Sequence, residues 1–344
     1  MKAVTFQDIG SVAVLETPEP IILEATDVIV KVTRCAICGS DLHLYHGDIP
    51  MLPGDTCGHE FTGIIEDTGS STSFKRGQRV VGTFHTACGA CAACQRHEFH
   101  LCSSAAVYGY GPIYGSMGGT QAEYARVPNA NINLRLIPEG LADEAALFTG
   151  DILTTAYGAV KNAKIGAGST VAVLGCGPVG IMAIQSAFAL GATRVIAIDL
   201  LEERLQLASG LGAETINASK SDAVGQVMAL TNGDGVDAVI EAVGGTKTIL
   251  MSFEMVRSGG YIAAVGVTSA QTFEYPLMQS LTKDITFRIG LANIHRDIDE
   301  TLELVRTGVI DPTIVISHRL ALEDAAEGYA LFDSRVASKV ILIP

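Results

Sequence analysis

A short glycine-rich stretch, residues 175–180, limits the fold of this chain more than any other feature. Its sequence Gly-Cys-Gly-Pro-Val-Gly matches the pattern G-x-G-x-x-G. It lies between an apolar run at 170–175, which predicts a buried strand, and a segment at 178–190 that predicts a helix. Because the pattern carries meaning only between a strand and a helix, this context favours a dinucleotide-binding turn over a chance match.

Each residue of this turn has an expected task. Gly175 permits the tight bend, Gly177 lets a pyrophosphate approach the backbone, and Gly180 allows the helix to pack closely on the sheet. Pro178 suits the first helical turn, where Val179 follows it and free N–H groups hold phosphate. We therefore expect all five residues to contribute to a cofactor site.

The next predicted strand, 194–199, ends in Asp199. An acidic side chain at this place accepts hydrogen bonds from the adenosine ribose and repels a 2′-phosphate, which favours NAD over NADP. The alternative role for Asp199 is to cap the predicted helix at 202–212. Further cofactor contacts are expected from four residues: Arg204, Val265, Gly266 and Val267.

Strands and helices alternate from about residue 168, with further strands predicted at 235–243 and 259–266. After about residue 290, the segment 297–310 predicts a helix. Near-continuous apolar strands in such a pattern indicate a doubly wound parallel sheet of the Rossmann type. The first 150 residues instead carry short β-type runs broken by Gly, Pro and Asp, which predict an antiparallel, barrel-like domain. We expect an α/β two-domain protein, with 151–290 as the nucleotide domain and 1–150 plus 291–344 as the other.

Composition and charge exclude several classes of partner. The formal net charge of −14 opposes binding to nucleic acid and to anionic membrane surfaces. The uncharged run 165–193 is long enough to span a bilayer, yet its central glycines and proline favour a strand, turn and helix. We see no signal peptide at the N-terminus and expect a cytoplasmic protein.

Four of the eight cysteines gather in fifteen positions, as Cys88-x2-Cys91-x2-Cys94-x7-Cys102. In a cytoplasmic chain, such spacing favours metal ligands over disulfides. Four thiolates complete a tetrahedral zinc site with no open position, so we expect a structural zinc. His97 and His100 lie inside the stretch, and we expect both to be bystanders.

A second set of metal-ligand side chains is scattered along the first domain: Cys38, His59 with Glu60, and Asp151. Thiolate, imidazole and carboxylate are the side chains that zinc takes, and three of them with an open position make a catalytic site. Taken singly, each has an ordinary structural explanation, such as a buried thiol, a packed histidine or a cap. The pair Cys35-x2-Cys38 also allows a thioredoxin-like redox motif.

Together, these motifs resemble the zinc-dependent medium-chain alcohol dehydrogenases over essentially the whole chain. The stretches "CGSDLH", "GHEFTG", the four-cysteine lobe and "VLGCGPVG" occur in the order typical of that family. The resemblance implies a GroES-like catalytic domain, a Rossmann domain and a C-terminal return to the first domain. It implies two Zn²⁺ per chain, one catalytic and one structural, with NAD(H) as cofactor.

The resemblance also assigns roles to individual residues. Catalytic zinc would be held by Cys38, His59 and Asp151, with Glu60 as an exchangeable ligand and Asp41 orienting His59. Ser40 would bond the substrate oxygen, and His43 would pass the proton to solvent. The expected substrate pocket comprises Phe84, Tyr110 and Leu291.

Asp151 resembles the bacterial secondary-alcohol dehydrogenases, which makes a secondary alcohol or its ketone the favoured small-molecule substrate. The chain departs from those relatives, because many of them lack the cysteine lobe and use NADP. Gly39 also stands where some animal relatives carry an arginine on the pyrophosphate. Polyol, threonine and primary-alcohol dehydrogenases therefore stay open as alternatives.

Two further alternatives are a zinc-free quinone or enoyl reductase and a zinc-dependent nucleic-acid binder. The negative charge and the cysteine spacing oppose the nucleic-acid binder. The reductase would leave the scattered ligands without a role. The resemblance also implies a homo-oligomer, with a tetramer favoured over a dimer.

Overall fold

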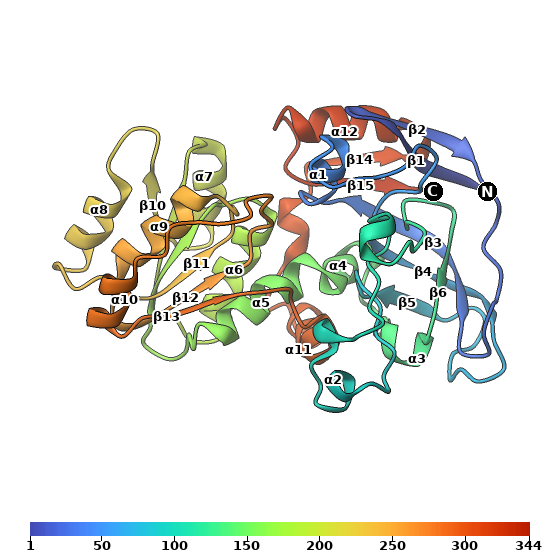
Figure 1. The fold of residues 1–344 in the computed structure, drawn as a ribbon, viewed down its shortest axis with the longest axis horizontal. Helices are drawn as coiled ribbons and strands as arrows, with labels where there is room; N and C mark the ends of the chain where they lie inside the picture. Colours follow the sequence, from blue (N-terminus) through green and yellow to red (C-terminus); the bar gives the residue numbers. More distant parts are fainter. The chain divides into compact units, whose positions relative to one another are not determined.

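The computed structural model describes all 344 residues and contains two compact units. The first comprises residues 1–154 and 293–344, and the second comprises residues 155–292. Figure 1 shows both units.

The second unit is built on a six-stranded sheet in the order β10-β9-β8-β11-β12-β13, with every neighbouring pair parallel. Its strands are β8 (Thr170–Leu174), β9 (Arg194–Asp199), β10 (Glu214–Asn217), β11 (Val236–Glu241), β12 (Val256–Ala264) and β13 (Thr286–Ile289). In β8, β9 and β11 successive residues are buried, so both faces of the sheet are covered. The strand order reverses beside β8, and such a point is where parallel sheets bind nucleotides.

Helices connect these strands (Figure 1). The connecting helices are α6 (Pro178–Ala189), α7 (Glu202–Gly210), α8 (Ala223–Leu230), α9 (Thr246–Met255) and α10 (Leu277–Lys283), and α5 (Ile152–Asn162) precedes β8. The predicted doubly wound parallel sheet is confirmed. The two helices predicted in this unit, α6 and α7, have boundaries within about two residues of the sequence-based ones, the extent to which frayed ends vary.

The first unit holds a mainly antiparallel seven-stranded sheet around the long strand β3 (Val28–Ile37). The other strands of that sheet are β4 (Glu60–Thr68), β5 (Arg79–Gly82), β6 (Tyr124–Val127), β7 (Leu134–Leu136), β14 (His318–Ala321) and β15 (Val340–Ile343). A separate hairpin pairs β1 (Lys2–Asp8) with β2 (Ser11–Glu16). As expected, the chain's last strand returns to this unit, because β15 pairs antiparallel with β3.

Short helices complete the first unit. The α-helices are α1 (Asp41–Tyr45), α2 (Ala92–Gln95), α3 (Ala130–Asn133), α4 (Asp143–Leu147), α11 (Ile294–Arg306) and α12 (Ala325–Asp333). The 3₁₀ turns are η1 (Phe99–Leu101), η2 (Pro112–Tyr114), η3 (Phe148–Gly150), η4 (Pro312–Val315) and η5 (Leu322–Asp324). The helix expected at 297–310 therefore begins three residues earlier and ends four earlier.

The uncharged run at 165–193 forms β8, the glycine turn and α6, as predicted. No helix in the structure has both the length and the apolar character needed to cross a bilayer.

Candidate active site and zinc centres

Pairing between β3 and β4 assembles the first group of metal-ligand side chains. Ala36 stands opposite Glu60 in this ladder, so Cys38, just beyond β3, meets His59 and Glu60 at the start of β4. Asp151 reaches the same place from the turn η3, where Gly150 accepts a hydrogen bond from the N–H of Phe84. A Cβ on Gly150 would lie 2.2 Å from the carbonyl oxygen of Gly82, so glycine is required for this close approach.

One candidate ligand atom from each of Cys38, His59, Glu60 and Asp151 lies within 4.8 Å of all the others. All four residues are buried. His59 Nε2 lies 3.2 Å from Asp151 Oδ2, and Cys38 Sγ lies 3.8 Å from the same oxygen. Sulfur, nitrogen and oxygen donors with this convergence are the set that binds zinc.

The charges in this group also fit a bound cation. A thiolate and two carboxylates this close would repel one another without positive charge between them. Burial and the neighbouring Glu60 carboxylate raise the pKa of Cys38 above its usual value. Burial alone would lower the pKa of His59, but the carboxylates of Asp41 and Asp151 outweigh it and raise that pKa well above 6.5. A divalent cation therefore matches the residues present.

Asp41 holds two members of the group in place. Its Oδ1 lies 3.1 Å from Nδ1 of His59, and its Oδ2 accepts the backbone N–H of Cys38 at 2.9 Å. Asp41 is 1% exposed, so both contacts are shielded from water. A carboxylate on the far nitrogen of a ligand histidine fixes the tautomer and the ring orientation.

The residues expected to handle the substrate and its proton lie around His59. Ser40 Oγ is 3.2 Å from His59 Nε2, and His43 Nδ1 is 3.0 Å from Asp48 Oδ2. The ring centroids of Phe84 and Tyr110 lie 6.2 Å and 5.5 Å from that of His59. The remaining pocket candidate, Leu291, belongs to the second unit and is 57% exposed.

Sequence reasoning missed Lys339, the residue immediately before β15. Its Nζ lies 2.8 Å from Glu60 Oε1, and the side chain is 1% exposed. Burial would lower the pKa of Lys339, but Glu60 and Cys38 outweigh it and raise that pKa above 10.5. The sequence signal that could have identified this residue was a single lysine before the apolar run "VILIP".

The four-cysteine lobe forms a second compact group. The sulfurs of Cys88, Cys91, Cys94 and Cys102 all lie within 4.8 Å of one another, and none is in a disulfide. Backbone N–H groups point at the sulfurs, and those of Cys94 and Ser103 lower the pKa of Cys91 to about 5. Neither His97 nor His100 belongs to the group. Four thiolate donors match a closed, structural zinc site.

The thioredoxin-like alternative for Cys35 and Cys38 lacks structural support. Cys35 Sγ faces the carbonyl oxygen of Leu342 on β15, and burial raises the pKa of its thiol. Cys38 faces Asp151 in the first metal-ligand group. A redox dithiol requires an accessible thiol with a lowered pKa.

In the second unit, the glycine turn has the backbone geometry that its pattern predicts. Gly175 has φ +88°, and a Cβ on Gly180 would lie 1.8 Å from the carbonyl oxygen of Gly175. Gly177 is the N-cap of α6, and a Cβ there would meet only the Arg204 guanidinium, at 3.7 Å. Glycine at 177 therefore leaves the helix N-terminus open for phosphate.

Asp199 ends β9 beside this turn. Its Oδ2 accepts the N–H of Cys176 at 2.7 Å, and its Oδ1 accepts those of Leu200 and Leu201. Arg204 Nη1 lies 3.8 Å from Oδ2. Asp199 thus orders the β9–α7 turn while its carboxylate stays at the carboxyl edge of the sheet, where ribose binds in such folds.

The segment after β12 lies at the same edge. The N–H groups of Val265 and Gly266 donate to the backbone oxygen of Glu241, at the end of β11. A Cβ on Gly266 would lie 2.0 Å from the nitrogen of Gly244, so the loops after β11 and β12 touch. Val267 follows, with 46% of its surface exposed.

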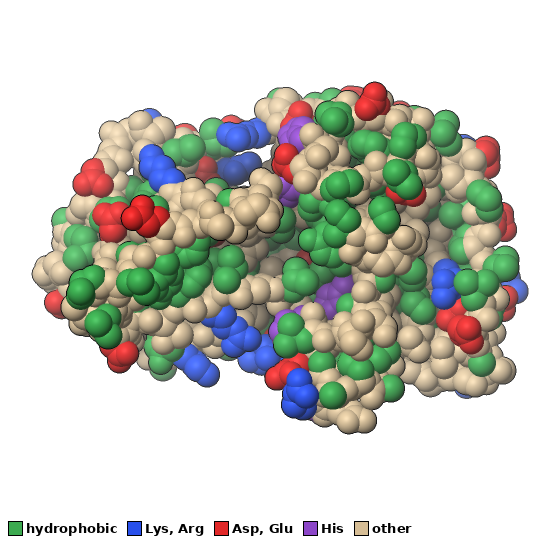
Figure 2. Space-filling view, in the orientation of Figure 1, with side chains coloured by type: hydrophobic (Ala, Val, Ile, Leu, Met, Phe, Trp, Pro, Cys, Tyr) green, Lys and Arg blue, Asp and Glu red, His purple; other side chains and the backbone are tan.

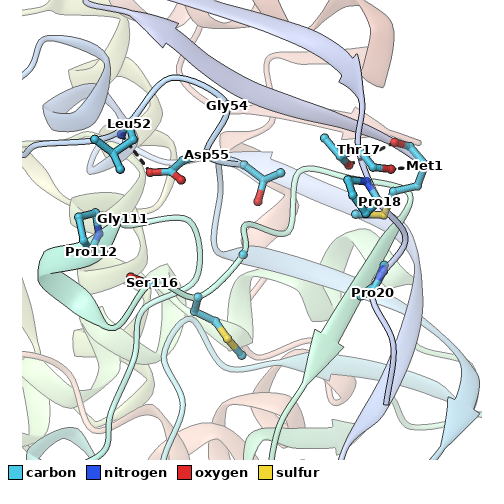
Figure 3. Close-up of a pocket in the computed structure, with 13 residues that line it drawn as sticks. Met1, Thr17, Pro18, Pro20, Leu52, Gly54, Asp55, Gly111, Pro112 and Ser116 are labelled. Atoms are coloured by element: carbon cyan, nitrogen blue, oxygen red, sulfur yellow. Dashed lines mark hydrogen bonds between the residues drawn. The ribbon is translucent and has the colours of Figure 1, made fainter. Parts of the chain in front are cut away.

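A separate cavity of about 390 Å³ opens on the first unit. Met1, the turn after β2 and the loops at 52–56 and 111–118 line it (Figure 3). Asp55 Oδ2 accepts the Leu52 N–H, and the Met1 amino group donates to the oxygen of Thr17. None of the candidate catalytic or metal-binding residues lines this cavity.

Known proteins share this sequence and this fold. The family profiles "Alcohol dehydrogenase GroES-like domain" and "Zinc-binding dehydrogenase" match residues 24–139 and 178–307. The zinc-type alcohol dehydrogenase-like protein AdhB of Bacillus subtilis (strain 168) is 39% identical, with both chains covered in full. An L-threonine 3-dehydrogenase of Bacillus velezensis is 34% identical over 100% of this chain and 99% of its own.

Among solved structures, alcohol dehydrogenase TADH from Thermus sp. ATN1 superimposes with a TM-score of 0.97. It is 49% identical, and the match covers 100% of this chain and 99% of the other. The matched region includes both units of this chain, with its two metal-ligand groups and its glycine turn. The chain therefore belongs to the zinc-binding medium-chain alcohol dehydrogenase family and is a zinc-dependent oxidoreductase of that type.

Proposed function

We propose that the enzyme transfers hydride between NAD(H) and a secondary alcohol or its ketone. In this proposal residues 1–150 with 291–344 form the zinc domain and residues 151–290 the NAD domain. The observation that carries it is the carboxylate of Asp151 in the group with Cys38 and His59. That ligand set is the one on which the resemblance to secondary-alcohol dehydrogenases rests.

The aromatic side chains support the same substrate class. The rings of Phe84 and Tyr110 each make a T-shaped contact with the His59 ring, and both side chains are less than 9% exposed. Apolar walls of this kind favour an alcohol with apolar substituents, since burying charged groups without partners costs free energy. The relative from Bacillus velezensis is named for threonine, whose hydroxyl is itself on a secondary carbon, so threonine is the second candidate.

Side chains of the first unit would orient the substrate and remove its proton. Ser40 Oγ would bond the substrate oxygen, and the proton would pass from the hydroxyl through Ser40 toward His43, which Asp48 orients. The C–H hydrogen would leave as hydride to the nicotinamide, giving a ketone, NADH and one proton. Zinc held by Cys38, His59 and Asp151 would supply Lewis acidity, which favours loss of the hydroxyl proton and polarises the carbonyl in reverse.

NAD is the proposed cofactor because the Asp199 carboxylate lies beside the glycine turn, where it accepts the N–H of Cys176 and where the adenosine ribose would bind. A 2′-phosphate there would meet like charge, whereas ribose hydroxyls would donate hydrogen bonds. Pro178, Val179 and the glycines of the turn would hold the pyrophosphate, with Val265, Gly266 and Val267 beside the same edge.

A matched substrate panel tests the assignment. The compounds are 2-butanol, 1-butanol, L-threonine and sorbitol, each with NAD and with NADP, and reduced nicotinamide absorbance gives kcat/KM. We expect the highest kcat/KM for 2-butanol with NAD. A higher value for 1-butanol would refute the secondary-alcohol class, and a higher value for threonine or sorbitol would refute a secondary alcohol with apolar substituents as the substrate. A higher value with NADP would refute the cofactor assignment.

We also propose that the enzyme is a homo-oligomer. The edge strand β13 leaves one side of its backbone unpaired, and α10 exposes Leu277, Met278 and Leu281 at more than 70% each. Figure 2 shows hydrophobic side chains gathered over the part of the second unit that contains α10. An open strand edge beside an apolar surface favours pairing with a second copy. Light scattering should give a particle mass that is a multiple of the 36.0 kDa chain mass, with four chains expected. The L281E substitution should lower that mass.

A further inference from the structure

Gln121 is fully buried and contacts Asp41, the partner of His59 in the catalytic group (Cys38, His59, Glu60 and Asp151). The backbone fixes its segment from two sides. Its N–H donates to the oxygen of Cys57, and its oxygen accepts the N–H of Val4. Neighbouring Thr120 donates to the oxygen of Gly58, immediately before His59. The Cα of Gln121 is therefore held in register with the His59 segment.

The glycine before His59 makes room for the Gln121 side chain. Gly58 has φ +87°, and a Cβ there would lie 2.3 Å from Cγ of Gln121 and 2.6 Å from its Cδ. Any larger residue at 58 would displace the glutamine side chain. The absence of a side chain at Gly58 therefore leaves the space that the Gln121 side chain occupies.

The hydrogen-bond partners of Gln121 determine how its amide is oriented. Its Nε2 lies 3.1 Å from the carbonyl oxygen of Ala36 and 3.2 Å from Oδ2 of Asp41. Both partners accept only, so the NH₂ group must face them. Oε1 then faces Tyr329, whose hydroxyl donates to it at 2.9 Å. Tyr329, on α12, is 1% exposed, so water does not compete for the amide.

The two carboxylate oxygens of Asp41 therefore have different partners. Oδ2 accepts from Gln121 and from the N–H of Cys38, and Oδ1 lies next to Nδ1 of His59. Gln121 is neutral, so it fixes the carboxylate without cancelling the negative charge that makes His59 more basic. A lysine in its place would weaken that charge, and a glutamate would repel it.

We propose that Gln121 is a positioning residue for His59: its amide, locked by Tyr329, fixes Asp41 and thereby aims Nε2 of His59 at the zinc. The inference rests on His59 being a zinc ligand, and it is independent of which alcohol the enzyme oxidises.

The test measures zinc release from the holoenzyme. Gln121→Met keeps the side-chain length and removes all three hydrogen bonds. A chelating dye such as 4-(2-pyridylazo)resorcinol reports zinc release over time, and the trace of His59→Ala identifies the phase that belongs to the four-cysteine site. We expect release from the catalytic group to accelerate roughly tenfold or more, the range typical when a residue that orients a metal ligand is lost. Release from the four-cysteine site should stay at the wild-type rate and serves as an internal control.

A double-mutant comparison separates positioning from packing. Tyr329→Phe should accelerate release less than Q121M does, and adding Y329F to Q121M should change nothing further, because Tyr329 acts through Gln121. Additive effects, or unchanged catalytic-zinc release in Q121M, would overturn the proposal. Gln185→Met, the same change at a buried glutamine of α6, should leave both rates unchanged.

Two further measurements cover the case in which Q121M does not fold and test the zinc site itself. If Q121M does not fold, Y329F alone must accelerate catalytic-zinc release for the proposal to stand. His59→Ala should retain one zinc per chain, and retention of two would refute the zinc site itself. If H59A retains one zinc per chain and Q121M releases its catalytic zinc at the wild-type rate, only the proposed role of Gln121 is refuted.

Discussion

The ammonium group of Lys339 lies 2.8 Å from Oε1 and 2.6 Å from Oε2 of Glu60, and both side chains are at most 1% exposed. The pairing of β15 with β3 carries this lysine into the catalytic group from the end of the chain, since Val340 stands opposite Ile37. Lys339 therefore supplies a fixed positive charge that faces the one carboxylate proposed to exchange at the zinc.

Lys339→Met should destabilise the fold, because it leaves the Glu60 carboxylate buried without its partner. Loss of one member of a buried ion pair costs about 3–5 kcal/mol. The free energy of unfolding in urea measures the effect. The double variant K339M/E60Q should recover part of the loss, and a K339M protein as stable as wild type would contradict this role.

Cys38→Ser should remove the catalytic zinc and abolish turnover, because the thiolate ligand is lost. NADH affinity, followed by fluorescence titration, should stay close to the wild-type value. Cys35→Ser is the matched control, since Cys35 is also buried but lies outside both metal-ligand groups. Turnover by C38S, or its loss in C35S, would contradict the assignment of the site.

Cys91→Ser should lower zinc content toward one per chain and lower the melting temperature, because the closed four-thiolate site is broken. Turnover per folded chain with an intact catalytic zinc should persist. His97→Asn is the control, since His97 lies in the same lobe with φ 58°, a conformation that asparagine tolerates. A C91S enzyme that keeps two zinc ions and full stability would show that the lobe is not a zinc site.

Asp199→Ala should raise kcat/KM with NADP relative to NAD by tenfold or more, because repulsion of the 2′-phosphate is removed and Arg204 is freed of its partner. A tenfold change corresponds to about 1.4 kcal/mol. Asp222→Ala, which removes the N-cap acid of α8 in the same unit, should leave the ratio unchanged. If the ratio of kcat/KM with NADP to kcat/KM with NAD is the same in D199A as in wild type, Asp199 does not select the cofactor.

Acid should weaken the packing of α11 through His295. Burial, the neighbouring His85 and the Arg135 guanidinium lower the pKa of His295 well below 6.5, and His100 acts in the same direction. Nε2 of His295 lies within hydrogen-bond distance of the side-chain oxygen Oδ1 of Asn133, at 2.8 Å. Below about pH 6.5 the unfolded chain binds a proton at this histidine that the folded chain does not.

The free energy of unfolding should therefore fall from pH 6.5 toward the folded-state pKa, by about 1.4 kcal/mol per pH unit for this one group. His295→Gln should flatten that dependence when unfolding in urea is compared at pH 5, 6, 7 and 8. His318→Gln on β14 is the control. An identical pH slope in H295Q and wild type would exclude this contribution.

Local sequence determined the nucleotide half of the protein. The apolar runs, the helix signals and the glycines at 175, 177 and 180 act over a few residues, since backbone conformation and periodicity are local properties. Strands β8, β9, β11 and β12 accordingly follow the predicted elements to within about three residues, whereas the short strand β10 was not predicted. The family resemblance similarly rested on short motifs that keep their order along the chain.

Only the tertiary structure decided what surrounds the catalytic group. Cys38, His59 and Asp151 are ordinary residues individually, and their convergence depends on the β3–β4 ladder and on close packing at Gly150. Lys339 and Gln121 carried no motif at all, since each reaches the site through strand pairing and a buried hydrogen bond across distant segments. Sequence periodicity records which way a side chain faces, whereas long-range pairing determines which partners it meets.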